Sequence, residues 1–377
     1  MSYSFPATRS PLSVLGLLLT LLLLTGCGSD DTSSASAGES ASAAASATEA
    51  ATEEAMDDDS ADEQEPSDDD GQDEPEESEE SDDAAAPAAP ETKEIEHELG
   101  TTTVVGVPER IVVLEYSFAD NLGTLDVVPV GYAVDAPPAY LAQYTEDLGS
   151  TIVGTRAEPN LEVIATLDAD LIIGDLRRHE ELYPQLSEIA PTLIFNSLRG
   201  SYQDQLDTFA VIADLLGEGD RATSMLDDYQ SRFDQAAEQS SDDAGAFVIG
   251  VLHADGYTAH SNQSFMGSFL EALGRTNALE PEGDETQFLL GLEGMATVNP
   301  SAIIVLCNPG DDELLGGLTS SSVWQSLDAA TNDRVFTFDR NLWSKGRGLL
   351  AYDLILSDAV DSGFLADGAN PGEPSCG

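Results

Sequence analysis

The stretch that decides the fold lies at residues 201–252 and reads SYQDQLDTFAVIADLLGEGDRATSMLDDYQSRFDQAAEQSSDDAGAFVIGVL. Its first forty positions carry apolar residues at helical spacing, interrupted only at Gly217-Glu218-Gly219. The apolar run at residues 246–252 then predicts a buried strand. A long helical segment directly before a new strand indicates a connection between two α/β lobes.

Short apolar runs alternate with helical patterns on both sides of this stretch. Strands that alternate with helices favour parallel sheets. The sequence therefore predicts an N-terminal α/β lobe at 93–216, a bridging helix at 217–243, and a C-terminal α/β lobe with its tail at 244–377. The predicted strands are residues 110–114, 127–131, 170–174, 191–195, 246–252, 302–306 and 334–338.

The chain is strongly acidic. It has 71 Asp+Glu against 14 Lys+Arg in 377 residues, for a formal net charge of −57. This balance excludes nucleic acid as a partner, and it repels anionic ligands unless arginines gather locally. Residues 28–92 hold 24 of the acids and no Lys or Arg. Their Ser, Ala and Pro content predicts a disordered acidic linker that spaces the folded part from a membrane, with weak calcium binding as the alternative.

The first 27 residues have the pattern of an export signal. Arg9 precedes an apolar run at 14–24, which is too short to span a bilayer as a permanent helix. Leu24-Thr25-Gly26-Cys27 resembles the lipobox of bacterial lipoproteins. Residues 1–27 are therefore predicted to be a lipoprotein signal peptide, with Cys27 as a lipidated anchor on the extracytoplasmic face of the cell membrane. An ordinary signal peptide with a chance cysteine is the alternative.

Two further cysteines, Cys307 and Cys376, remain in what would be an exported chain, where disulfides persist. We expect them to form a bond that ties the C-terminal tail to the second lobe. Two cysteines alone do not form a zinc site, and the four histidines lack metal-ligand spacing. No metal site and no cofactor are predicted.

The pattern L-E-x-x-A-T occurs twice, at 161–166 and at 292–297, each time before a short polar turn and an apolar strand. In both copies a glutamate, Glu162 or Glu293, opens a predicted helix, where the helix dipole favours a carboxylate. Helix capping explains the pair. A partner that straddles both lobes explains it as well.

Several motifs follow one another in the order and at the spacing of a known family. Together, over roughly residues 95–362, they resemble the periplasmic-type siderophore-binding proteins of ABC importers, and among them the iron(III) dicitrate branch. The motifs are residues 110–120, 153–156 with 159–162, 170–175 ahead of Arg178-His179, and 342–348.

This resemblance implies two Rossmann-like lobes bridged by a rigid helix, with the ligand held in the cleft between them. It implies a monomeric binding protein without enzyme activity that delivers ferric citrate, or a related iron(III)–siderophore complex, to an ABC permease dimer with its cytoplasmic ATPase. In the family a glutamate on each lobe docks onto arginines of the permease subunits. Glu162 and Glu293 match those glutamates.

Arginines at predicted strand ends are the main candidates for ligand binding. Iron(III)–citrate is a compact polyanion whose metal is already coordinated, so the protein must complement carboxylates, for which arginine is best suited. Arg156, Arg178 and Arg347 are predicted to form a cationic clamp, although Arg156 could instead pair with Glu158 at the surface. The glycines that flank Arg347 are expected to let the backbone approach a ligand, without a packing role.

The resemblance adds five further ligand-binding candidates around this clamp. Arg199 stands beside Leu198, which occupies the position where the family carries an arginine. An ordinary core position is the alternative for the tryptophan of this set, and a solvated position is the alternative for the histidine. The five candidates are Tyr116, Ser117, Arg199, Trp343 and His260.

Two other classes of function stay open at this point. A binding protein for another siderophore, heme or cobalamin is one, although a catecholate or heme ligand would call for more aromatic residues than the 6% present. An enzyme on a similar two-lobe scaffold is the other. Against an enzyme, the sequence contains no G-x-S-x-G elbow, no P-loop and no cysteine cluster.

Overall fold

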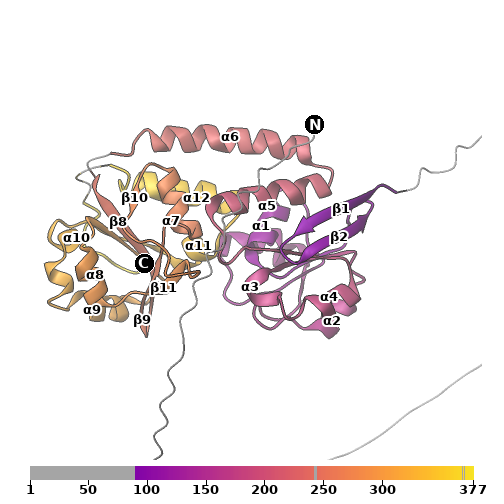
Figure 1. The fold of residues 1–377 in the computed structure, drawn as a ribbon, viewed down its shortest axis with the longest axis horizontal. Helices are drawn as coiled ribbons and strands as arrows, with labels where there is room; N and C mark the ends of the chain where they lie inside the picture. The colour runs from indigo at the N-terminus through magenta and orange to yellow at the C-terminus, as the bar shows by residue number, and fades with distance from the viewer. Residues whose placement is uncertain (1–89, 242–243, 367, 369) are drawn as a thin grey trace, which may run out of the picture. The chain divides into compact units, whose positions relative to one another are not determined.

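A computed structural model describes residues 90–241, 244–366, 368 and 370–377. The predicted signal peptide with Cys27 lies outside the described residues, and so does nearly all of the predicted acidic linker. Within the described part, two lobes follow each other along the chain, with helix α6 (Gly219–Ala237) between them (Figure 1). None of the described helices combines the length and apolar character that a membrane crossing requires.

The N-terminal lobe is built around a five-stranded sheet with the order β5-β4-β3-β6-β7, in which every pairing is parallel. Its central strands are fully buried apolar runs, as parallel strands covered on both faces require. A separate hairpin, β1 and β2, precedes this sheet. The elements are β1 (Thr92–His97), β2 (Gly100–Val105), β3 (Ile111–Val113), α1 (Tyr116–Thr124), β4 (Gly131–Tyr132), β5 (Thr151–Ile152), α2 (Leu161–Ala165), β6 (Leu171–Asp175), α3 (Leu176–His179), α4 (Tyr183–Ile189), β7 (Thr192–Phe195) and α5 (Tyr202–Leu215).

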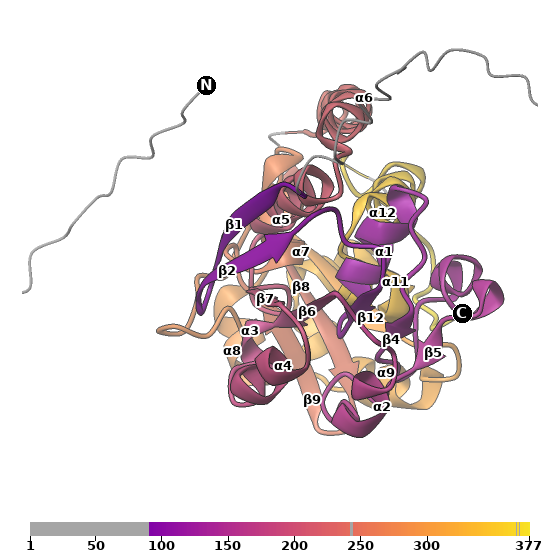
Figure 2. The ribbon, with the colours of Figure 1, turned by 90° about the vertical axis from the view of Figure 1, so that its right-hand side faces the viewer.

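Helix α6 packs along both lobes through one apolar stripe. Ala222, Tyr229, Phe233 and Ala236 are its buried residues, and their spacing places them on one face. Both views show α6 above α5 of the N-terminal lobe and α12 (Leu349–Asp361) of the C-terminal lobe (Figures 1 and 2). Its 19 residues extend about 28 Å as an α-helix.

Aromatic rings from four helices lock this bridge in place. Tyr202 of α5 stacks on Phe233 of α6, with 5.5 Å between the ring centroids. The same ring meets Phe269 of α7 (Phe265–Ala272) and Tyr352 of α12 edge-on, at 5.3 and 5.5 Å. Such aromatic contacts favour one fixed geometry, so the lobes share a single packed core next to α6.

The C-terminal lobe contains a mixed sheet with the order β11-β9-β8-β12-β13, and β10 pairs with β8. Strands β8, β12 and β13 are parallel, whereas β9 runs antiparallel to β8 and to β11. The two-residue turn Ala254-Asp255 sends the chain straight back, and Gly256 after it has a positive φ of 135°. The elements are β8 (Ala246–His253), β9 (Gly256–His260), α7, β10 (Thr276–Asn277), β11 (Gln287–Leu289), α8 (Leu292–Val298), β12 (Ala302–Cys307), α9 (Asp312–Thr319), α10 (Asp328–Thr331), β13 (Val335–Asp339), α11 (Arg340–Lys345) and α12.

The fold class predicted from the sequence is confirmed, with one refinement. The N-terminal sheet is parallel, as expected, but the second sheet carries the antiparallel strands β9 and β11. Both lobes nevertheless keep the order of parallel strands and covering helices that the alternating pattern indicated.

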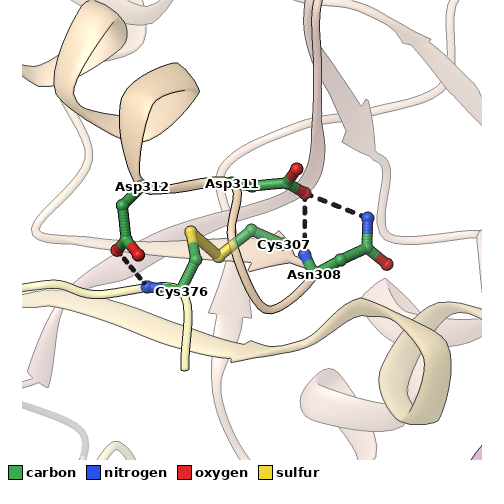
Figure 3. The surroundings of a disulfide bond; sticks show 5 residues. All are labelled: Cys307, Asn308, Asp311, Asp312 and Cys376. Atoms are coloured by element: carbon green, nitrogen blue, oxygen red, sulfur yellow. Dashed lines mark hydrogen bonds between the residues drawn. A yellow bond between two sulfur atoms is a disulfide. The ribbon is translucent and has the colours of Figure 1, made fainter.

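A disulfide joins the C-terminal tail to the end of β12. Cys307 and Cys376 are bonded, with 5.7 Å between their Cα atoms, and both are buried (Figure 3). The backbone N–H of Cys376 donates to Asp312 of α9 at 2.9 Å, which holds the tail beside this helix. The tail is thus attached to the second lobe by a covalent bond and by a hydrogen bond.

Candidate functional site

The candidate site begins where β3 of the N-terminal sheet ends. Ligands bind at the carboxyl ends of strands in α/β folds. Glu115 and Tyr116 come one residue after this strand, and the side chain of Glu115 is completely buried. Its carboxylate accepts a hydrogen bond from Arg156 Nη1 at 3.1 Å and a second one from Arg178 Nε. Glu115 therefore brings two of the predicted clamp arginines together.

Arg156 is the most fully paired arginine of the site. Its Nε and Nη2 donate to the two carboxylate oxygens of Asp135 at 2.6 and 2.9 Å, and its guanidinium lies 4.1 Å from the centre of the Tyr116 ring. Burial works to lower the pKa of Arg156, but the bonds to Asp135 and the charge of Glu115 outweigh it and raise that pKa. The surface pairing with Glu158 that the sequence left open is not what the structure shows.

Arg178 is held by the turn between β6 and α3. The Asp175 side chain accepts from the backbone N–H of Arg178 at 3.1 Å and caps this short helix. His179 Nδ1 accepts from the Asp175 N–H at 2.8 Å, and its Nε2 donates to the carbonyl of Arg156 at 2.8 Å. Burial lowers the pKa of this histidine, and its two ring nitrogens connect the two strand-end loops.

Arg347 enters the site from the C-terminal lobe, between α11 and α12. It is 4% exposed, and its Nη2 donates to the Ser344 carbonyl at 2.6 Å. Within the described part of the chain, Nε and Nη1 have no hydrogen-bond partner. Burial lowers the pKa of this guanidinium, the charges of Arg156 and Arg178 lower it further, and Glu115 opposes them. Arg347 is therefore a buried cation with free donors, next to the other two arginines.

His260 and Arg199 extend this cluster. His260 is the last residue of β9 and is 3% exposed. Burial, followed by the positive charges of Arg347 and Arg199, lowers the pKa of its imidazole to about 3. His260 Nδ1 and Arg199 Nε are buried and make no hydrogen bond to any described residue. The solvated position considered for His260 is wrong, because β9 carries it into the interior.

The three remaining candidates make internal contacts. Tyr116 Oη donates to the Asp135 carbonyl at 2.6 Å, and burial raises the pKa of this phenol to about 12. The hydroxyls of Ser117 and Ser197 lie 2.7 Å apart. Trp343 is fully buried, stacks on Phe338 at 4.1 Å between ring centroids, and donates to Asp358. Trp343 thus takes the core position that the sequence allowed as its alternative.

The glycines that flank Arg347 are required by packing, so the expectation that they have no packing role is wrong. A Cβ at Gly348 would lie 2.1 Å from Asp120 Oδ1, and one at Gly346 would lie 2.6 Å from the Leu342 carbonyl. Helix α12 therefore approaches α1 more closely than any other residue type would allow. This close approach fixes where the backbone of Arg347 lies.

Asp120 of α1 joins the two lobes at this point. It is completely buried and accepts from the backbone N–H groups of Leu350 and Ala351, both at 3.1 Å, and from Tyr140 Oη at 2.7 Å. A carboxylate at the N-terminus of α12 is favoured by the helix dipole. Burial is nevertheless the larger effect and raises the pKa of Asp120 to about 6, while these hydrogen bonds oppose the increase.

We expect Asp120→Asn to change how stability depends on pH. An aspartate with a raised pKa in the folded state stabilises the fold below its unfolded pKa near 4 and loses that contribution as the pH rises through about 6. The free energy of unfolding of the natural protein, relative to that of the variant, should fall by about 3 kcal/mol across this window and stay flat above it. Urea unfolding of both proteins from pH 4 to pH 7 measures this difference, and parallel curves would contradict the assignment.

Glu162 and Glu293 are exposed in the first turns of α2 and α8. The N-cap of α2 is Asn160, whose side chain accepts from the Val163 N–H at 3.1 Å. The N-cap of α8 is Gly291, which has no capping side chain. Neither glutamate is therefore an N-cap, although both lie where a helix dipole favours a carboxylate.

Sequence reasoning gave no role to the carboxylates of this site. Glu115, Asp135 and Asp175 pair with or brace the arginines, and Glu285 forms ion pairs with Arg177 and Arg199. Glu115 had a readable signal, because a carboxylate directly after a buried strand needs a cation. The others come from distant segments and had none. Among the described residues, His, Cys, Asp and Glu form no group of three or more that could hold a metal ion.

The sequence is similar to that of known binding proteins. Residues 111–342 match the family model described as periplasmic binding protein. The Fe(3+)-citrate-binding protein YfmC of Bacillus subtilis is 34% identical over 272 residues, which cover 72% of this chain and 85% of that protein. The Fe(3+) dicitrate-binding periplasmic protein FecB of Escherichia coli is 32% identical over 274 residues, which cover 71% and 88%.

Solved structures show the same architecture. SirA of Staphylococcus aureus, solved in complex with staphyloferrin B, aligns with a TM-score of 0.62 and 26% identity, over 72% of this chain and 98% of SirA. The catecholate-siderophore binding protein VctP of Vibrio cholerae aligns with a TM-score of 0.62 and 21% identity, over 72% and 100%. The second likeness bears on the fold alone.

Proposed function

Because this chain belongs to the periplasmic binding protein family, we propose that it is an extracytoplasmic substrate-binding lipoprotein that captures an iron(III)–siderophore complex, ferric citrate in particular, and delivers it to an ABC permease. On this proposal the lipid on Cys27 holds the protein at the membrane, and the acidic segment at 28–92 spaces its lobes from the surface. The protein binds and releases its ligand unchanged.

One observation carries the choice of ligand. The described part of this very acidic chain gathers Arg156, Arg178 and Arg347 around one site, and Arg347 keeps two buried donors without a partner. A buried cation with free donors is costly unless an anion completes it. Arginine donors favour planar carboxylates. A complex with several carboxylates is therefore the ligand that this site fits best.

The three arginines differ in how many of their nitrogens are already paired within the protein. Asp135 and Glu115 already occupy Arg156, so this residue chiefly holds the site in shape. Arg178 donates its Nε hydrogen bond to Glu115, and Arg347 donates from one nitrogen to a backbone carbonyl. We therefore assign the direct ligand contacts to Arg347 and Arg178, with His260 and Arg199 at the edge of the same cluster.

Equilibrium binding to a panel of complexes tests this function. Ferric citrate should change the fluorescence of Trp324 and Trp343 in the full-length protein, and this change should saturate. Iron-free citrate should bind more weakly because it offers fewer preorganised carboxylates. Ferric catecholate and hydroxamate complexes serve as the comparison. Saturable binding of one of these, together with no response to ferric citrate, would contradict the ligand that we propose.

A further inference from the structure

A short segment of the C-terminal lobe, residues 285–287, touches the N-terminal lobe beside the arginine cluster. Glu285 pairs with Arg199 Nη2 at 3.2 Å and with Arg177 Nη2 at 3.5 Å. Gln287 Nε2 donates to the Leu198 carbonyl at 3.1 Å, and Arg199 Nη1 approaches the Gln287 carbonyl at 3.4 Å. The segment thus fastens one lobe to the other with Glu285 as its charged group.

Two arginines, Arg177 and Arg199, pair with the Glu285 carboxylate. Burial lowers the pKa of Arg199, the charges of Arg177 and Arg178 lower it further, and Glu285 opposes them. The side chain of Arg199 is 27% exposed, and that of Glu285 is 47% exposed. Glu285 is therefore a half-exposed carboxylate that pairs with two arginines without being buried between them. Another anion that reaches Arg199 can displace it.

We propose that Glu285 is a built-in competing anion that determines which anions reach the arginine cluster. It holds Arg177 and Arg199, keeps small inorganic anions off them, and yields to a ligand that brings several carboxylates at once. The proposal rests on the proposed function, because it adds a selectivity rule to the same site.

The selectivity follows from multivalency. When a phosphate ion displaces Glu285, the arginines gain one or two exposed contacts to phosphate and lose as many to Glu285. The free energy of this exchange is therefore close to zero. A polycarboxylate complex already held at Arg178 and Arg347 presents a further carboxylate to Arg199 at a high effective concentration. That ligand can displace Glu285, and the lone ion cannot.

Chemical modification tests this proposal without any siderophore. Phenylglyoxal modifies arginines, and mass spectrometry of the digested full-length protein gives the rate for Arg199. Glu285→Gln should raise this rate about threefold to tenfold, as loss of exposed ion pairs predicts. Inorganic phosphate should then protect Arg199 in the variant and not in the natural protein. Equal rates, or no protection by phosphate in the variant, would overturn the proposal.

Asp284→Asn is the matched control for the lost charge. Asp284 is the exposed neighbour of Glu285, and its side chain makes no hydrogen bond or ion pair with other described residues. It changes the net charge by the same amount and leaves the ion pairs intact. A rate for Arg199 in this control equal to that in Glu285→Gln would show a general charge effect and overturn the proposal.

Binding of ferric citrate in phosphate-free buffer, with phosphate then added, provides the second test. Glu285→Gln should bind ferric citrate about threefold to tenfold more tightly than the natural protein, and phosphate should weaken its binding at lower concentration. If Glu285→Gln binds ferric citrate as tightly as the natural protein does, the role of Glu285 is overturned and the proposed function is not. If the natural protein does not bind ferric citrate at all, the proposed function fails, and the modification rates of Arg199 still decide the role of Glu285.

Discussion

Arg347→Ala should weaken the binding of ferric citrate at least tenfold. Arg347 is 4% exposed and has two guanidinium nitrogens without a partner among the described residues, so a bound carboxylate would complete it. A hydrogen bond between charged groups contributes about 1.5–3 kcal/mol, which corresponds to roughly tenfold to a hundredfold in affinity. Fluorescence titration of the variant and of the natural protein measures the change.

Two controls make this result specific. Arg232→Ala removes an exposed arginine that pairs with Asp353 on α12, so it changes the net charge equally and should leave affinity unchanged. Thermal unfolding should show that Arg347→Ala is no less stable than the natural protein. The substitution removes only one hydrogen bond of the guanidinium, and it also removes the cost of burying this charge. An affinity equal to that of Arg232→Ala would refute the direct contact that we assign to Arg347.

Arg156 does not provide an equivalent experiment, although the sequence grouped it with Arg347. Its guanidinium compensates the buried Glu115 and is paired with both oxygens of Asp135. Removing one partner of a buried ion pair leaves the other uncompensated and strongly destabilises the fold. Loss of binding after that substitution would therefore not separate a ligand contact from a disturbed site.

The central strands of the parallel sheets could be predicted because they are continuous apolar runs. The predicted strand 127–131 is wrong except at its last residue, because β4 is Gly131–Tyr132, and the two-residue strand β5 was not predicted. Residues 171–173 and 302–306 are completely buried, and the short length of these apolar segments favours strands over helices. Strand β9 was not predicted because its residues 258–260 are mixed in polarity and one of its two partner strands, β11, lies far along the chain. The turn at Ala254-Asp255 with Gly256 was the signal that could have revealed it.

The arginines of the site could be predicted from their rarity and from their place after strands. Their division into paired and unpaired cations could not, because it depends on carboxylates from other segments. Asp135 and Glu285 are ordinary acids within a sequence of 71 acids, and only the folded chain brings them to Arg156 and Arg199. The same holds for Asp120, whose contact with α12 makes Gly348 necessary.

Glu162→Ala combined with Glu293→Ala should lower iron uptake from ferric citrate at least tenfold per folded molecule. We propose that each glutamate docks onto arginines of one permease subunit. Loss of one charge-assisted hydrogen bond at such a contact costs about 1.5–3 kcal/mol. Affinity for ferric citrate should stay unchanged, because the described side chains that pair with the clamp arginines do not include either glutamate. Uptake of labelled iron by cells supplied only with ferric citrate, divided by the amount of folded protein, measures the effect.

The rival explanation is that both carboxylates only stabilise their helices. Asn160 already caps α2, so the loss of Glu162 would cost only the dipole interaction, about 0.3–1 kcal/mol in stability, and uptake would follow protein abundance. Asp220→Ala with Glu313→Ala is the matched control, since both are exposed acids in the first turns of α6 and α9. Uptake per folded molecule that equals this control would refute the docking role, whereas a selective loss can arise only if Glu162 and Glu293 meet the permease.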